Sequence, residues 1–420
     1  MKTVLSLFLI LTLAGMAFGS GESEIAKEIT VLMNAPDAPI EVAASARFHA
    51  DFPDVKITAL QVDRSDGSTL TMDAQLAAGT PPNIYRDFIG RVSKYYVPEY
   101  ALDLAPHIRD LDQYNPGVLE PFKRDGMLMG LPAAGGVQAF GINLDITDAV
   151  GFEVRDDWTI DEFMDLAERV KQFYDGEKYV TALFAGNQSG DYLINNWFAA
   201  FGVRYYDPGD YSRTTIAETG GAKVYEFFQT LVRNGYVKDG AAMFTDDDYV
   251  LHWAGGEIAG GAYFPSWEPA YFQALMDQGR IEGPFRHKYV PFPRGPGVDS
   301  VPTYSSYEAF VVHRTDTEAD VWAARLVEYM NDAIYQTVGC SVLAISPSRS
   351  DVVVISDDPD FPKTAEIAQQ NGLFDVGLTS PLYAATRPQH FPVLQKVLNL
   401  EVTPEEGIRD YERRLNAVLE

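Results

Sequence analysis

The sequence has little cysteine and little positive charge, and both shortages limit what the protein can be. Cys340 is the only cysteine among 420 residues, so no intramolecular disulfide can form and the fold must be held by its core. Lysine and arginine number 33 against 60 aspartates and glutamates, which gives a formal net charge of −27. A surface of that sign repels phosphate backbones and anionic lipid headgroups. We therefore expect neither nucleic acid nor a membrane surface as a partner.

Catalytic signatures are missing as well. The 6 histidines are scattered, and no His-Glu-x-x-His pair stands at metal-ligand spacing. The sequence has no Gly-x-Ser-x-Gly elbow, no phosphate-binding loop and no dinucleotide fingerprint. The acidic runs FTDDDYV and DDPDF lack the alternating ligands of an EF-hand, and helix capping or turns explain them better. We expect no cofactor, no metal and no catalytic residue, so the sequence does not favour an enzyme.

Long apolar runs are confined to the N-terminus. Lys2 precedes an apolar run over residues 4–14, and Ala17-Phe18-Gly19 resembles a signal-peptidase site. The run is shorter than the ~20 residues that span a bilayer. We expect residues 1–19 to be a signal peptide that is cleaved before Ser20. No cysteine stands at the new N-terminus, so we expect no lipid anchor.

The remaining sequence is typical of a globular α/β protein. Hydrophobic residues make up 46% of the chain, and its length suggests two domains or two lobes. EITVLM at residues 28–33 alternates as a strand, a helix follows over residues 40–52, and VKITALQV at residues 55–62 alternates again. In LAAGTPPNIY, Gly79 ends a second helix and the prolines direct residues 83–85 into a third strand. This order predicts a parallel sheet with crossover helices.

A second α/β block follows. MLMGLPAAGGVQAFGINLD, from Met127, contains a strand over residues 137–143. Thr159 and Glu162 form a capping box before an amphipathic helix. We expect further strands at residues 179–184 and 258–263, further helices at 191–200, 221–234, 246–254, 269–278 and 319–330, and a C-terminal helix capped by Thr403.

Several stretches come in an order that resembles the extracellular solute-binding proteins of ABC importers. They are LAAGTPPNIY, MLMGLPAAGGVQAFGINLD, WTIDEFMDLAERV, GGAKVYEFFQTLVRNGYV, FTDDDYVLHWAGGEIAGGAYFPSW and YVPFPRGPG followed by YEAFVVHRTDTEADVWAARLVEYM. The chain is most similar to the carbohydrate-binding group, family 1, which includes maltose-binding protein. The resemblance covers nearly all of the chain after the signal peptide.

The resemblance implies a fold and a function. The fold would be a two-lobed periplasmic-binding-protein fold of type II, in which each lobe is an open, mostly parallel sheet flanked by helices. Lobe one would contain residues 20–134 and 290–342, and lobe two residues 135–289 and 343–420. The function would be the capture of an oligosaccharide or glycoside by lobe closure and its delivery to an ABC permease, by a monomer free in the periplasm. Two alternatives stay open: a receptor for a polyamine, peptide or phosphate ester, and an exported glycoside hydrolase.

A sugar site needs planar polar side chains for the hydroxyl groups and flat aromatic rings for the C–H faces. The resemblance matches Trp267 to the family's stacking tryptophan and makes Glu268 a hydroxyl acceptor, although FPSW stands where relatives often have Gly-Pro-Trp. The structural alternatives are core packing for Trp267 and stabilisation of a helix N-terminus for Glu268. We assign Trp158, Trp253 and Trp322 to packing.

The other candidates lie where the chain is expected to reach the cleft. Some follow strands, because ligands of open α/β sheets bind at the carboxyl ends of the strands. The rest offer backbone amides to a ligand, begin a helix, precede a strand that returns to lobe one, or lie in the segment that enters lobe two near the end of the chain. These candidates are Arg86, Asp87, Asn34, Asp37, Gly135, Gly136, Asp191, Tyr192, Tyr304, Ser305 and Arg387. Each has a structural alternative, such as a surface ion pair for Arg86 and Asp87 or a helix N-cap for Asp191.

Overall fold

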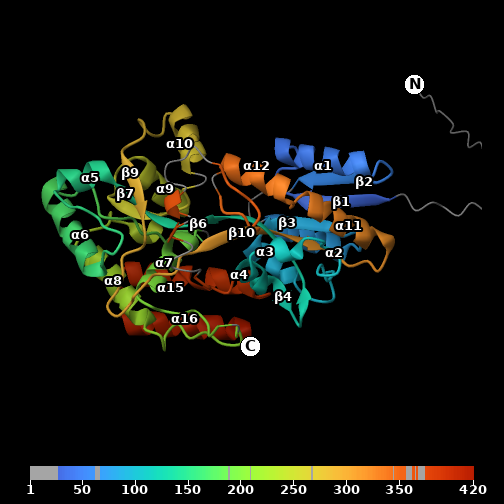
Figure 1. Ribbon diagram of the computed structural model, residues 1–420. Coiled ribbons are helices and arrows are strands. Elements are labelled where there is room, and N and C mark those ends of the chain that lie inside the picture. The colour runs from blue at the N-terminus through green and yellow to red at the C-terminus, as the bar shows by residue number, and fades with distance from the viewer. Residues whose placement is uncertain are drawn as a thin grey trace, which may run out of the picture.

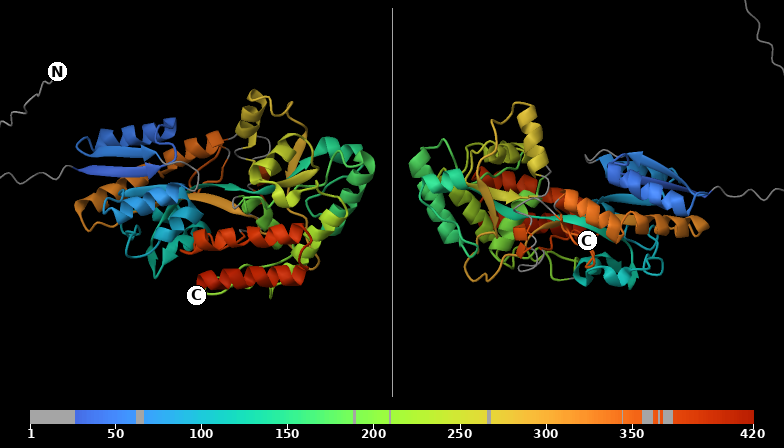
Figure 2. Two further views of the ribbon diagram at one scale, coloured as in Figure 1. Left: turned by 180° about the vertical axis from the view of Figure 1, so that it is seen from behind. Right: turned by 45° about the horizontal axis from the view of Figure 1, so that its top comes forward.

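The computed structural model describes residues 27–61, 67–187, 190–208, 210–265, 268–343, 345–355, 362–364, 366–367 and 374–420. The expected signal peptide lies outside these residues, and so does Trp267. Within the described ranges, no helix is long and apolar enough to cross a membrane. The chain forms two packed bodies that lie side by side (Figures 1 and 2).

The first body is built on a five-stranded sheet with the order β2-β1-β3-β10-β6. The strands are β1 (Glu28–Met33), β2 (Lys56–Gln61), β3 (Ile84–Phe88), β10 (Ser305–Val312) and β6 (Leu131–Val137). β1 pairs in parallel with β2 and β3, whereas β10 runs antiparallel to β3 and β6. The predicted strand–helix–strand–helix–strand order at the start of the chain is therefore confirmed.

The LAAGTPPNIY joint forms as its sequence predicts. α1 (Pro39–Asp51) and α2 (Gly67–Ala77) follow β1 and β2. Gly79 has φ of +71°, a left-handed conformation that glycine adopts without steric penalty. The amide of Thr80 still donates to the carbonyl of Gln75, and the prolines then prevent another helical turn. The chain therefore leaves α2 directly into β3.

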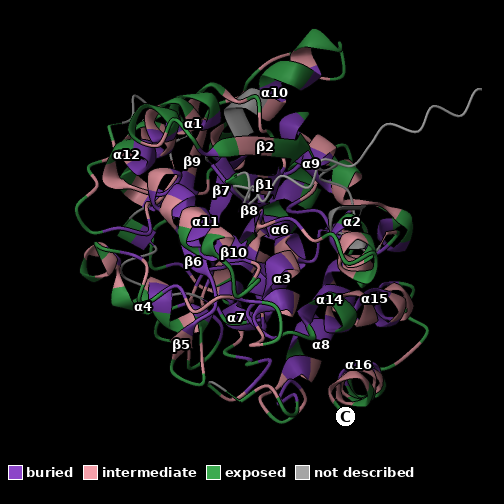
Figure 3. Ribbon diagram, turned by 90° about the vertical axis from the view of Figure 1, so that its right-hand side faces the viewer, coloured by how far each residue is buried: buried purple, intermediate pink, exposed green. Residues whose placement is uncertain are grey.

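Short segments and two longer helices complete the first body. α3 (Ile89–Val92) leads directly from β3, and α4 (Pro116–Leu119) precedes the small hairpin of β4 (Lys123–Arg124) and β5 (Met127–Leu128). α11 (Glu318–Tyr329) and α12 (Ala333–Leu343) follow β10 and pack beside α1. α1, α11 and α12 carry exposed residues on their outer faces, whereas α3 and the central strands are largely buried (Figure 3).

The second body has a three-stranded sheet with the order β8-β7-β9. β7 (Ala139–Asn143) is antiparallel to both β8 (Gly260–Tyr263) and β9 (His287–Val290). Parallel pairing, expected to dominate each lobe, is thus confined here to single bridges such as Tyr179 with Ile258. Among the described residues, the strand expected at residues 179–184 forms only that bridge, although the Val180 carbonyl also accepts from the amide of Gly260 at the start of β8.

Helices surround this second sheet. They are α5 (Leu144–Ala149), α6 (Ile160–Tyr174), α7 (Tyr192–Ala200), α8 (Gly221–Arg233), α9 (Asp246–Ala254), α10 (Glu268–Asp277), α14 (Tyr383–Thr386), α15 (Phe391–Leu398) and α16 (Pro404–Leu419). The predicted capping boxes of α6 and α16 are present. A third one, Thr245 with Asp248, caps α9, so the FTDDDYV run serves as a helix start.

Each body has its own hydrophobic core, and we call the parts around them lobe one and lobe two. Trp158, Trp197 and Trp253 are all buried in the lobe-two core. Trp322 packs at the edge of lobe one, where its ring centre lies 5.2 Å from that of Phe52. The packing roles predicted for Trp158, Trp253 and Trp322 are confirmed. The exact lobe boundaries stay a prediction.

The two lobes are joined where strands cross. β6 belongs to the first sheet and β7, two residues later, to the second, so the chain crosses at Gln138. It returns between β9 and β10. The two crossings are bonded to each other: the Gln138 amide donates to the Tyr304 carbonyl at 3.0 Å, and Thr303 Oγ1 donates to the Gln138 carbonyl at 2.6 Å.

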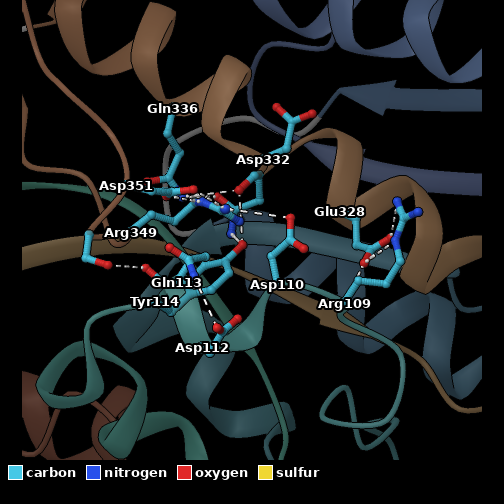
Figure 4. A network of polar contacts seen from close by, with 12 residues as sticks. Arg109, Asp110, Asp112, Gln113, Tyr114, Glu328, Asp332, Gln336, Arg349 and Asp351 are labelled. Atoms are coloured by element: carbon cyan, nitrogen blue, oxygen red, sulfur yellow. Dashed lines mark hydrogen bonds and ion pairs between the residues drawn. The ribbon is translucent and has the colours of Figure 1, made fainter.

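The chain after α12 stays attached to lobe one for several residues. Arg349 donates to both carboxylate oxygens of Asp351, at 2.9 and 2.8 Å, and its guanidinium lies 5.0 Å from the centre of the Tyr114 ring (Figure 4). Tyr114 in turn donates to the carbonyl of Asn331 at 3.0 Å. Ser348 Oγ donates to the carbonyl of Pro132 in β6 at 2.8 Å. This polar network therefore joins the segment after α12 to the far strand of the first sheet.

Candidate functional site

Asn34 directly follows β1, as the sequence predicts, whereas Arg86 and Asp87 lie within the adjacent strand β3 and not after it, because β3 continues to Phe88. Asp87 is buried, with 1% of its surface exposed. Its carboxylate accepts from Asn34 Nδ2 at 3.4 Å, from the Tyr85 hydroxyl at 3.1 Å and from the Phe88 amide at 2.7 Å. Arg91, at i+4, forms an ion pair with it at 3.3 Å. Asn34 Oδ1 is buried and has no hydrogen-bond partner among the described residues.

Arg86 is next to Asp87 in the chain but points to the other face of the sheet, because side chains alternate along a strand. Its guanidinium donates to Glu308 at 3.0 Å, to the Tyr335 hydroxyl at 2.8 Å and to the buried Glu41. Burial opposes its charge, but Tyr335, Glu308 and Glu41 together raise the pKa of Arg86 well above its ordinary value. Arg86 therefore ties β3, β10, α1 and α12 together within lobe one.

The remaining lobe-one candidates lie in an exposed turn or form contacts within the sheet that explain them structurally. Asp37 is exposed in the turn before α1. Gly135 and Gly136 lie within β6, and the Gly135 amide and carbonyl both bond to Ser346 at 2.9 Å. A Cβ on Gly135 would come within 2.6 Å of the Tyr307 ring, so the glycine permits that ring to lie flat on the strand. Ser305 Oγ donates to the Gly136 carbonyl at 3.2 Å.

Four candidates from distant parts of the chain meet in lobe two. Asp191 precedes α7 but does not cap it. Its carboxylate instead accepts from Arg387 Nε at 2.5 Å, from the Tyr383 hydroxyl at 3.1 Å and from Asn195 Nδ2 at 3.3 Å. Burial opposes the Arg387 charge, but Asp191 and Tyr383 raise the pKa of Arg387 above its ordinary value. The ion pair is nearly buried, with side-chain exposures of 16% for Arg387 and 5% for Asp191.

Aromatic rings adjoin this ion pair. The ring centres of Tyr192 and Phe264 are 5.6 Å apart, those of Tyr192 and Tyr304 are 6.2 Å apart, and those of Phe264 and Tyr304 are 6.1 Å apart. Phe264 lies three residues before Trp267, whose position is outside the described residues. Glu268 begins α10, and its side chain is likewise outside the description. Tyr192 and Tyr304, which the sequence names as separate candidates, thus lie side by side, and Phe264 connects them to the segment that carries Trp267 and Glu268.

The segment around Tyr383 brings the lobe-two cluster against lobe one. The Tyr383 ring centre lies 6.4 Å from that of Phe88. Ser93 Oγ donates to the carbonyl of Ser380 at 3.0 Å. A Cβ on Gly90 would overlap the Tyr383 ring, so glycine is required for this close approach. Phe88 therefore connects the Asp87 cluster of lobe one with the Asp191 cluster of lobe two.

Sequence reasoning missed Tyr383, Asn195 and Phe88. Asn195 carried a usable signal, because a residue at i+4 from Asp191 on the same helix lies on the same face. Tyr383 and Phe88 carried none, because aromatic residues are usual in cores and only the fold brings these two rings together.

The combined arrangement suits a polar ligand with apolar faces. It offers a carboxylate–guanidinium pair, a second buried carboxylate, amides and several tyrosine rings within two adjoining clusters. Planar polar groups and flat rings are what hydroxylated rings require. Groups of three or more His, Cys, Asp or Glu side chains that could hold a metal ion are absent from the part of the chain that is described.

The fold and this placement of polar side chains define the class, a two-lobed periplasmic-binding-protein fold of type II. Within that class, the chain belongs to the bacterial extracellular solute-binding proteins, whose family model matches residues 43–368. No curated protein sequence matches the chain.

Solved structures of the same fold are similar over almost the whole chain. The GacH receptor of Streptomyces glaucescens, solved unliganded and with acarbose, has a TM-score of 0.73 at 16% identity and covers 94% of this chain and 99% of its own. The cyclic α-maltosyl-1,6-maltose binding protein of Arthrobacter globiformis has a TM-score of 0.76 at 19% identity, with coverages of 93% and 98%. A chitin oligosaccharide binding protein has a TM-score of 0.73 at 17% identity, with the same coverages.

Proposed function

We propose that the protein captures an oligosaccharide or a glycoside between its lobes and delivers it to an ABC-type permease. The observation that carries this proposal is the meeting of Asp191, Arg387, Tyr192 and Tyr304 in one buried cluster beside lobe one. Bidentate polar groups serve the hydroxyl rows of a sugar, and tyrosine rings serve its C–H faces. The sugar ligands of the similar structures support the same ligand class.

The proposed site has two sides. Lobe two contributes Asp191, Arg387, Tyr192, Tyr304, Trp267 and Glu268, and lobe one contributes Asn34 and Asp87. Arg86 is left out, because its donors are already engaged by Glu41, Glu308 and Tyr335. A ligand that touches both sides binds the closed form better than the open form, so it shifts the population toward closure.

The proposal also covers the oligomeric state, the location and the lobe boundary of the protein. We infer a monomer, exported after cleavage near Gly19, that acts in the periplasm without a lipid anchor. We further infer that the chain leaves lobe one after about residue 351, since Ser348 and Arg349 are bonded to lobe-one residues.

Calorimetric titration of the purified protein tests the ligand class. The panel contains maltotriose, a chitin oligosaccharide and acarbose, with spermidine, a tripeptide and a sugar phosphate as non-sugar solutes. We expect binding to at least one neutral sugar. Binding to a non-sugar solute with no response to any sugar would overturn the proposal. Turnover of chromogenic glycosides, measured in a separate assay, would indicate a glycoside hydrolase instead.

Trp267→Ala tests the predicted stacking residue, with Trp322→Ala as the matched control. Loss of a stacking ring should weaken sugar binding by roughly tenfold or more. Trp322 packs on the outside of lobe one, so its substitution should change the melting temperature and leave affinity unchanged. Equal affinities for the two variants would remove Trp267 from the site.

A further inference from the structure

A small cavity borders the Asp191–Arg387 ion pair. Its volume is about 10 Å³, which is at the lower limit of what one internal water molecule needs. The polar side chains on its wall include Asp191, Asn195, Tyr205, Arg387, His390 and Tyr411. They come from α7 and the chain on either side of it, from α16 and from the chain between α14 and α15, so the cavity lies where the C-terminal helices meet the ligand cluster.

His390 is the exceptional group on this wall. It is 1% exposed, and neither of its ring nitrogens has a hydrogen-bond partner among the described residues. Buried polar atoms in folded proteins are almost always hydrogen-bonded, so two unpartnered nitrogens on one ring require an explanation.

Two tyrosines hold the imidazole in place. The Tyr411 ring stacks on it at 4.6 Å with 13° between the planes, and the Tyr225 ring lies nearly parallel to it at 6.0 Å with 20° between the planes. The edge of the Phe198 ring also contacts it, at 5.5 Å. The nitrogens of an imidazole form hydrogen bonds in the plane of the ring, so a partner for His390 would lie at the edge of the ring and not over its stacked face.

We propose that the cavity is a binding site for one internal water molecule, hydrogen-bonded to His390 and to the polar wall formed by Asp191 and Asn195, and that His390 thereby positions the Asp191–Arg387 pair. An internal water needs two to four polar partners, and this wall supplies them. The positioning role rests on the proposed function, whereas the water site does not.

The charges around His390 are consistent with a neutral ring. Burial lowers the pKa of His390 to about 4, with the Asp191 carboxylate opposing the shift. The other titratable groups that face it are the hydroxyls of Tyr205, Tyr225 and Tyr411, whose pKa values burial raises well above the ordinary value. Arg387 lies on the wall of the same cavity, and it is already paired with Asp191. A neutral imidazole can accept one hydrogen bond and donate another, and it does not compete with Arg387 for the carboxylate.

Two variants separate a water site from an empty void. His390→Phe keeps a flat ring against the tyrosines but removes both nitrogens. Tyr225→Phe is the matched control, because it also deletes a buried polar atom without a partner among the described residues, and Tyr225 is not on the cavity wall. We expect His390→Phe to lower the melting temperature by a few degrees and Tyr225→Phe to leave it unchanged or raise it. A higher melting temperature for His390→Phe would overturn the proposal.

A high-resolution crystal structure gives the second readout. Electron density for one water within hydrogen-bond distance of His390 is expected in the parent protein and not in His390→Phe. Empty density in the parent protein would overturn the water site whatever the melting temperatures are.

The positioning role is measured without a ligand. In a ¹⁵N-labelled sample, the Nε–H signal of Arg387, identified by its loss in Arg387→Lys, reports the hydrogen bond to Asp191. We expect its exchange with solvent to become several-fold faster in His390→Phe and to stay the same in Tyr225→Phe. An unchanged signal in both variants would overturn positioning. Failure of the proposed function would instead show as an absence of sugar binding in the parent protein, with these signals intact.

Discussion

Lobe one and lobe two each bury an arginine beside a carboxylate, but the two arginines have different surroundings. Arg86 in lobe one donates to Glu41, Glu308 and Tyr335, which come from three separate elements. Arg387 in lobe two is paired with Asp191, which it shares with Tyr383 and Asn195. Next to that second pair lie the cavity and the unpartnered His390.

The different surroundings of Arg86 and Arg387 distinguish a structural ion pair from one that is available to a ligand. Every partner of Arg86 belongs to lobe one, so the pair only strengthens a single lobe. The Arg387 pair adjoins Tyr383, whose ring touches Phe88 of the other lobe. Only the second arrangement is placed where lobe closure and a ligand can act on it.

The largest expected effect is on stability and comes from Arg86→Met. Removal of the guanidinium leaves Glu41 buried without its cation, which should lower the free energy of unfolding by about 3–5 kcal/mol. Urea unfolding measures the change. The control is Lys56→Ala, because the Lys56–Glu28 pair is exposed and its loss should change the stability by less than about 1 kcal/mol. A stable Arg86→Met protein that no longer binds sugar would move Arg86 into the ligand site.

The two arginines also show which features of the fold and the site could be predicted from the sequence and which could not. Strand and helix order, the Gly79 joint and the capping boxes were predictable, because they depend on local spacing and on the conformations that glycine and proline allow. The face to which Arg86 points was not predictable, since it depends on strand register and on Glu41 and Tyr335 from distant helices. The role of Asp191 was not predictable either. Its position before a helix suited an N-cap, but in the structure its carboxylate pairs with Arg387, which is far along the chain.

A second effect concerns acid, and it comes from a buried histidine of lobe two. The unfolded chain takes up a proton on histidine near pH 6.5, whereas the native state resists it at His390 until about pH 4. The contribution of His390 to stability is therefore fully present above pH 6.5 and is lost as the pH falls toward 4, by on the order of 3 kcal/mol. Unfolding free energies at several pH values measure it. His390→Phe should flatten this part of the profile, and an identical slope in the variant would contradict the prediction.

A third effect is on affinity and compares the two arginines directly. Arg387→Lys keeps the charge but loses the planar fork that can bind a carboxylate and a hydroxyl row together. We expect sugar affinity in calorimetry to fall roughly 10–100-fold, which corresponds to about 1.4–2.8 kcal/mol. Arg86→Lys should leave affinity within about twofold, because its partners lie within lobe one. Similar losses in both variants would erase the distinction between the arginines.

The smallest effect should come from Asn34→Ala, and it tests whether lobe one takes part in the site at all. The bond from Asn34 Nδ2 to Asp87 is long, at 3.4 Å, and Asp87 keeps the Phe88 amide, Tyr85 and Arg91 as donors. The free energy of unfolding should therefore fall by less than about 1 kcal/mol. Asn34 Oδ1 has no partner among the described residues, so a ligand hydroxyl could use it. If lobe one contributes, affinity falls several-fold while stability hardly changes. If affinity is also unchanged, lobe two alone recognises the ligand. The two lobes then differ in their whole contribution to ligand binding, and not only in the surroundings of their arginines.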